Sequence, residues 1–126
     1  MRAVETNVLL QLLPHDDIEQ AARAEEFVAA GAWVSQLVLA ETLWALESVY
    51  DRKPARLAAA LALLLEHECL VLQDADRVTA ALAHFKRKPK LGFSDCLVLE
   101  IARKAGHLPL GTFDTGLAKL EGAAQL

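Results

Sequence analysis

The chain has 126 residues, of which 54% are hydrophobic, and its formal net charge is −4 at pH 7. This size favours a single domain, residues 1–126, that buries roughly two-thirds of its unfolded surface. The negative charge argues against a protein that binds nucleic acid through bulk positive charge. The longest apolar run, residues 57–65, is far shorter than the roughly 20 residues of a membrane span.

Two further features bear on the cellular compartment in which the protein is expected. Glu5 and Asn7 interrupt the segment in which a signal peptide has its apolar core. Cys69 and Cys96, the two cysteines, lie in apolar surroundings without metal-ligand spacing. We therefore expect a soluble cytoplasmic protein whose thiols are reduced and buried.

Short apolar segments alternate with helix-like segments along the whole chain. The predicted strands are residues 2–4, 32–34, 70–72 and 108–113, with a short edge strand at 122–126. The predicted helices run from residue 16 or 17 to 31, 36 to 50 or 51, 56 to 67, 75 to 85, 94 or 95 to 105, and 115 to 120. This alternation is typical of a parallel sheet covered on both faces, so we predict an α/β fold with three α/β/α layers.

Local signals support several helix starts. Asp16 or Asp17, Ser35 and Asp74 are suited to the N-cap, where a side-chain oxygen accepts a hydrogen bond from a free backbone N–H group. Pro54 suits the first helical position, where its missing N–H group is not needed. The helix after Pro54 is rich in Ala and Leu, which is a mild indication of a subunit interface.

Two glutamates in predicted helices have contrasting neighbours. Glu41 has Leu37, Val38, Trp44 and Ala45 three and four positions away, so we expect it at the centre of a buried stripe. Glu100 instead precedes Arg103 and Lys104 at these spacings, which predicts an ordinary solvated pairing.

Four acidic residues lie in apolar sequence far apart along the chain: Glu5, Glu41, Asp95 and Asp114. An acid that is buried without a partner is costly, and carboxylates without matching Lys or Arg are the oxygen ligands that Mg²⁺ and Mn²⁺ prefer. Glu5 and Asp114 follow predicted strands, where ligands bind in parallel sheets. The four acids therefore predict a shared metal site, although Glu5, Asp95 and Asp114 are also suited to cap helices.

The segments that carry these acids are VETNVL at residues 4–9, SQLVLAE at 35–41, GFSDCL at 92–97 and TFD at 112–114. In this order they resemble the PIN domain, and within it the VapC-type toxins of bacterial toxin–antitoxin pairs. The resemblance covers the whole chain. Each motif is weak by itself, and the four in series are fairly specific.

The resemblance implies a ribonuclease that depends on Mg²⁺ or Mn²⁺ and leaves a 5′-phosphate and a 3′-hydroxyl. It implies Glu5, Glu41, Asp95 and Asp114 as catalytic metal ligands, with Thr6, Asn7 and Thr112 as supporting polar residues. It also implies a homodimer and a VapB-type antitoxin whose C-terminal tail covers the acidic pocket.

The chain departs from the family pattern at two positions. The first acid of the family is normally Asp, whereas this chain has Glu5, which is either a natural ligand or a substitution that reduces toxicity. Gly116 stands where relatives often have an acidic or polar residue, which predicts a weaker second-metal site.

The basic run, Lys86, Arg87, Lys88 and Lys90, is either a solvated loop or a contact for RNA phosphates.

Two other functions compete with the nuclease. A PIN-fold binding module weakened by Glu5 would still bind an antitoxin. A phosphohydrolase of the haloacid-dehalogenase or receiver class also has acids at strand ends. The dehalogenase class requires an Asp-x-Asp at the first strand, where this chain has ETN at residues 5–7. The receiver class requires an Asp after a middle strand, and none is evident.

Overall fold

The computed structural model describes residues 1–14 and 18–126, so the predicted caps Asp16 and Asp17 lie outside the described residues. The chain forms two compact units, Met1–Ala75 and Asp76–Leu126. Each unit has its own helices and a short parallel sheet. The predicted α/β class is therefore confirmed.

The first unit contains a three-stranded sheet in the order β1-β2-β3, with all strands parallel. The strands are β1 (Arg2–Ala3), β2 (Ala32–Val34) and β3 (Leu70–Leu72), so two of the three match their predicted bounds. In β2 the side chains of Ala32 and Val34 are buried and Trp33 between them is 38% exposed. This alternation follows from the pleat, which directs successive side chains to opposite faces.

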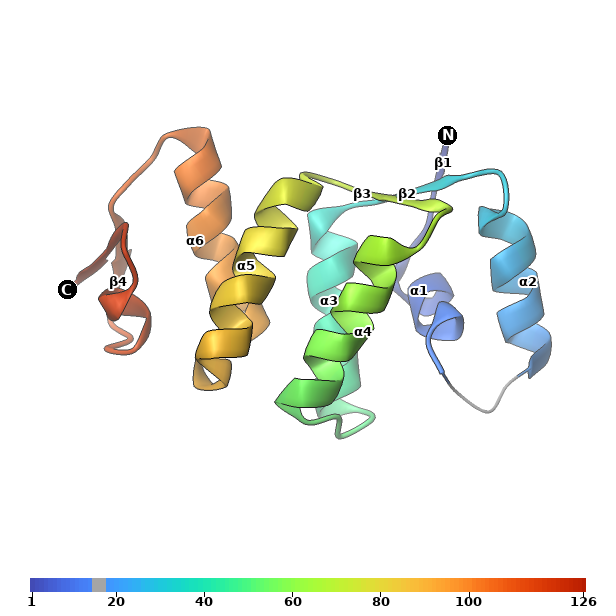
Figure 1. Cartoon of the computed structure of the whole chain (residues 1–126), viewed down its shortest axis with the longest axis horizontal. Coiled ribbons are helices and arrows are strands. Elements are labelled where there is room, and N and C mark those ends of the chain that lie inside the picture. The colour runs from blue at the N-terminus through green and yellow to red at the C-terminus, as the bar shows by residue number, and fades with distance from the viewer. Residues whose placement is uncertain (15–17) are drawn as a thin grey trace. The chain divides into compact units, whose positions relative to one another are not determined.

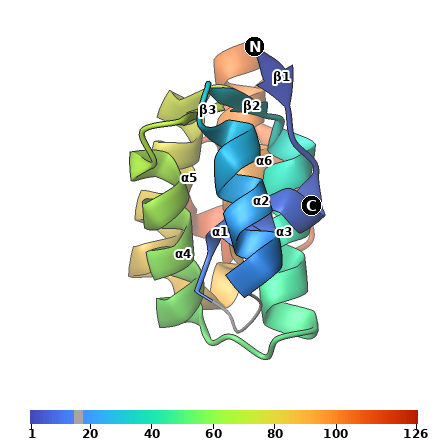
Figure 2. The same ribbon diagram turned by 90° about the vertical axis from the view of Figure 1, so that its right-hand side faces the viewer.

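Four helices accompany this sheet: α1 (Thr6–Leu12), α2 (Ile18–Val28), α3 (Gln36–Ser48) and α4 (Pro54–Glu66). In Figures 1 and 2 the three strands lie at one end of the unit and the helices lie below them. Two predicted helix starts are confirmed. The Ser35 hydroxyl accepts a hydrogen bond from the Val38 N–H at 3.1 Å, and Pro54 is the first residue of α4.

The helices of the second unit are α5 (Ala75–Arg87), which begins at the boundary between the units, and α6 (Phe93–Ala105). The rings of Phe85 and Phe93 meet edge to face, with centroids 6.4 Å apart, an arrangement that aromatic pairs prefer. Helix α6 ends as predicted at Gly106, whose φ of 82° is the left-handed conformation that glycine adopts at low cost. None of the helices in residues 1–14 and 18–126 is long and apolar enough to cross a membrane.

Short elements complete the second unit: the 3₁₀ helices η1 (Pro89–Leu91) and η2 (Leu117–Lys119) and the strands β4 (Leu110–Thr112) and β5 (Ala123–Gln125). Strand β5 pairs parallel with β4, which confirms the predicted edge strand. The helix predicted at residues 115–120 is wrong in type and length, because only the single turn η2 forms.

The cysteines are free, as expected. Cys96 is buried, and this burial raises the pKa of its thiol to about 11, so the thiol is protonated at neutral pH. Cys69 is only partly buried, which corrects the expectation that both thiols are inside.

Candidate functional site

Glu5 links β1 to α1 and caps the helix. One oxygen of its carboxylate accepts a hydrogen bond from the backbone N–H of Asn7 at 3.0 Å. This bond satisfies one of the free N–H groups of the first turn, and it confirms the capping role that the sequence left open. The side chain is exposed. A carboxylate has about four lone-pair sites, so the cap leaves acceptor capacity at Glu5, beside Thr6 and Asn7.

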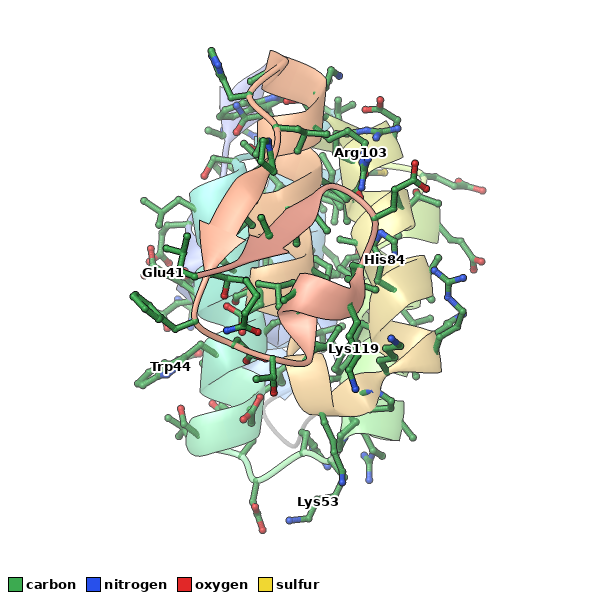
Figure 3. All side chains as sticks on the ribbon, turned by 90° about the vertical axis from the view of Figure 1, so that its left-hand side faces the viewer. Glu41, Trp44, Lys53, His84, Arg103 and Lys119 are labelled. Carbon is green, nitrogen blue, oxygen red and sulfur yellow. The ribbon has the colours of Figure 1, made fainter. Side chains whose placement is uncertain are left out.

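Glu41 is exposed, and the prediction that it lies at the centre of a buried stripe is wrong. Its neighbours Leu37 and Trp44 are 70% and 67% exposed, and Figure 3 shows Glu41 and Trp44 projecting from α3 on the same side. The opposite face of α3 is the buried one, with Leu39, Thr42, Leu43 and Leu46. Because α3 is apolar on both faces, the spacing of its apolar residues did not indicate which face enters the core.

Asp95 lies in the first turn of α6 and is exposed. The helix begins at Phe93, earlier than predicted, and Gly92 occupies the N-cap without a side-chain hydrogen bond. The capping role considered for Asp95 is therefore wrong. The alternative, an acid in the first turn that interacts with the helix dipole, agrees with its position. Among the described residues the Asp95 carboxylate has no hydrogen-bond or ion-pair partner.

Asp114 follows β4 and caps the turn that leads into η2. Its Oδ1 atom accepts hydrogen bonds from the N–H groups of Gly116 at 2.8 Å and Leu117 at 3.0 Å. The Thr112 hydroxyl in turn accepts a bond from the Asp114 N–H at 3.0 Å. The helix that Asp114 was considered to cap does not form, and Gly116 is the N-cap of η2. Asp114 instead orders the turn before η2, and the Thr112 hydroxyl bonds its backbone. Gly116 provides a backbone donor to the acid.

Asp114 acts electrostatically on Asp95 within the second unit. Partial loss of hydration raises the pKa of Asp95, and the negative charge of Asp114 raises it further. Two carboxylates held together without a cation repel each other, and a bound divalent cation relieves that repulsion. In neither unit, over the residues described, do three or more His, Cys, Asp or Glu side chains converge closely enough to hold a metal ion.

A family profile for the PIN domain matches residues 3–123, which span both units. The chain belongs to the PIN domain family. No curated protein matches the chain. PIN domains are generally metal-dependent nucleases, and they usually use divalent metal ions. The matched range includes all four acids singled out from the sequence.

The donor chemistry of this PIN domain suits a hard divalent cation. Asp95 and Asp114 provide carboxylate oxygens from one unit, and Asp95 is not engaged by another residue of the described structure. Glu5 and Glu41 provide exposed carboxylates from the first unit. All four acids are exposed, so burial does not force them to share a metal. The prediction that they bind a metal therefore rests on donor type, on the charge of Asp114 near Asp95 and on the family.

The sequence did not indicate the role of Glu100, an acid of the second unit with several side-chain partners. Glu100 is buried, with 3% of its side chain exposed, so the predicted solvated pairing is wrong. It accepts hydrogen bonds from Arg77 at 2.9 Å, His84 at 2.9 Å and Arg103 at 3.2 Å. Of these three partners, only Arg103 lies within one helical turn of Glu100 in the sequence. Arg77 and His84 come from α5.

Lys104, the other cation expected to pair with Glu100, contacts Asp76 at 3.2 Å instead. The basic run adopts a different form from the predicted loop. Lys86 and Arg87 end α5, and Lys90 lies within η1, with all the cations of the run exposed. Cations at a helix C-terminus interact favourably with its dipole, which is a structural reason for part of this run.

Proposed function

We propose that this PIN domain is an endoribonuclease that depends on Mg²⁺ or Mn²⁺ and serves as the toxin of a type II toxin–antitoxin pair. The observation that carries the proposal is that Asp95 and Asp114 lie in one unit, near enough for the charge of Asp114 to raise the pKa of Asp95. The order of the four acidic motifs along the matched range supports the same function.

Each acid has a distinct task in this proposal. Asp95 and Asp114 would hold the cation through their carboxylates, and the family resemblance implies Glu5 and Glu41 as further ligands. A bound Mg²⁺ or Mn²⁺ lowers the pKa of a water molecule and offsets charge on the scissile phosphate. Hydrogen bonds from Gly116 and Leu117 keep the Asp114 carboxylate oriented, and Thr112 holds the Asp114 backbone.

Glu5→Asp is expected to increase cleavage of total RNA by roughly tenfold in Mg²⁺. Glu5 carries one more methylene than the family's Asp, and Mg²⁺ requires near-ideal octahedral geometry. Asp is also among the best N-cap residues, so the shorter acid should preserve the cap on α1. Cleavage is measured from the appearance of 5′-phosphorylated fragments. A slower Glu5→Asp variant would show that Glu5 is the working ligand.

The proposed partners are an antitoxin of the VapB type and a second copy of the chain, as the resemblance implies. An exposed apolar strip on α3, formed by Leu37 and Trp44, supports a protein partner because it flanks Glu41. Side chains of this size gain most from burial when a partner covers them. The same strip supports the second candidate function, a PIN-fold binding module that retains its partner but cleaves little because of Glu5.

Trp44→Ala is expected to weaken antitoxin binding by at least about tenfold, since truncating a buried interface Trp typically costs 2 kcal/mol or more. The measurement is titration calorimetry with a purified VapB-type antitoxin. Val71→Ala is a suitable control, because Val71 is an exposed apolar residue on β3 of the same unit. Equal losses in both variants would contradict a specific role for the strip.

A further inference from the structure

A basic cleft of about 630 Å³ lies within the second unit, and we propose that it binds a phosphate group of an RNA strand. Helix α5, helix α6 and the turn between η2 and β5 line it (Figure 3). Its charged and titratable residues are His84, Arg87, Lys88, Glu100, Arg103, Lys119 and Glu121. The cleft is thus rich in cations, although the chain as a whole carries a net charge of −4.

The acid at the base of the cleft is neutralised by the protein itself. Glu100 is buried and bound by Arg77 and Arg103, at 2.9 and 3.2 Å. Arg103 also donates to the backbone carbonyl of Glu121 at 2.6 Å. Because these two guanidinium groups offset the negative charge of Glu100, the remaining cations of the cleft are not needed to neutralise it.

His84 connects Glu100 to one of those remaining cations. Arg87 donates to His84 Nδ1 at 3.0 Å, because arginine has no acceptor atom. His84 Nε2 donates to the Glu100 carboxylate at 2.9 Å. This chain of hydrogen bonds uses one nitrogen of Arg87 and holds its guanidinium group at the cleft, with other N–H donors left for a ligand.

Lys88 and Lys119 provide two more charges at the cleft. Both side chains are exposed, and neither has a hydrogen-bond or ion-pair partner among the described residues. Lys88 follows the C-terminus of α5, whereas Lys119 ends η2. A fixed guanidinium and two free ammonium groups form a site that suits the oxygens of a phosphate.

The position of Lys119 favours a phosphate within a strand. Lys119 is five residues after Asp114, and Asp114 caps the turn that leads to it. None of the four acids proposed as metal ligands lines the cleft. The cleft would then bind a phosphate other than the one that is cleaved. This inference rests on the proposed nuclease function for the identity of the strand.

The test compares two double variants with the same change in charge. Binding of a labelled single-stranded RNA is measured by anisotropy in EDTA, over a range of salt concentrations. Lys88→Gln/Lys119→Gln is expected to weaken binding by at least tenfold and to reduce the slope of log K against log salt by about 0.7, which is the contribution of one phosphate contact on a single strand. Arg23→Gln/Lys53→Gln removes two exposed charges of the first unit and should change binding less than threefold.

Each outcome decides the proposal. A loss of RNA affinity that is confined to Lys88→Gln/Lys119→Gln supports the proposal. An equal loss of RNA affinity in both double variants indicates an effect of bulk charge and overturns the proposal. Unchanged RNA binding in the cleft variant also overturns it. If uridine monophosphate binding depends on Lys88 and Lys119 but RNA binding does not, the site takes a free nucleotide and the strand assignment is wrong. Because binding is measured without metal, RNA bound through the cleft but never cut in Mg²⁺ would contradict the nuclease proposal alone.

Discussion

Asp95→Asn is expected to lower the rate of RNA cleavage in Mg²⁺ by about a thousandfold. The substitution removes one anionic oxygen ligand and leaves a neutral amide of the same size. The lower activity is therefore expected to result from weaker binding of the cation. A metal supplies several kcal/mol of transition-state stabilisation, and about 4 kcal/mol corresponds to a factor of a thousand. Single-turnover cleavage of a labelled RNA measures this loss.

Glu47→Gln is the matched control for this prediction, because Glu47 is an exposed acid on α3 that none of the four motifs contains. Its cleavage rate should remain within twofold of the parent rate. Full activity in Asp95→Asn would remove Asp95 from the site, and inactivity in every variant would favour the binding module.

The stability of Asp95→Asn separates a ligand from a structural residue. Folding raises the pKa of Asp95 through partial loss of hydration and the charge of Asp114. A group whose pKa is raised stabilises the fold below its unfolded pKa, and this stabilisation is lost as pH rises through the folded pKa. At pH 7 the charged Asp95 therefore opposes folding, and Asp95→Asn should melt at a higher temperature than the parent without metal.

Mg²⁺ should then stabilise the parent and not the variant. A ligand at ten times its Kd stabilises the folded state by about 1.4 kcal/mol. Calorimetric melts of both proteins with and without Mg²⁺ measure the difference. An equal Mg²⁺ effect on both proteins would place the cation elsewhere.

Glu100→Gln is expected to destabilise the fold by about 2 kcal/mol. Removing one partner of a buried charge cluster leaves the others uncompensated, and here Arg77 and Arg103 would lose their shared carboxylate. These arginines are 25% and 30% exposed, so water screens them and the loss is smaller than at a fully buried pair. Urea unfolding at pH 7 measures the change, with Glu47→Gln as an exposed control.

The difference in unfolding free energy between the parent and Glu100→Gln should depend on pH. Burial alone would raise the pKa of Glu100, but hydrogen bonds from His84 and Arg103 outweigh it and hold this pKa below the ordinary value of 4.5. The charge of Glu100 therefore stabilises the fold above pH 4.5, and this contribution is lost as pH falls through the folded pKa. The gap in unfolding free energy between parent and Glu100→Gln should shrink below pH 4.5. A constant gap down to pH 3 would contradict the ionic role.

Much of the local structure follows from short-range signals. Ser35 caps α3, Pro54 starts α4 and Gly106 ends α6, because each residue acts on backbone groups within one turn. Strands β2 and β3 have their predicted bounds for a similar reason, as each is a short apolar run between helices. The four motifs in series also indicated the family, since their order is a property of the chain itself.

Tertiary structure alone decided which acids are buried. Glu41 has apolar neighbours at helical spacing and Glu100 has Arg103 and Lys104, yet Glu41 is exposed and Glu100 is buried. Helical spacing describes residues within four positions, whereas Glu100 is held by Arg77 and His84, which lie 23 and 16 residues away. The exposed face of α3 and the basic cleft of the second unit likewise depend on packing between elements. Burial of a charge is settled by such distant partners, and the local pattern of residues does not contain them.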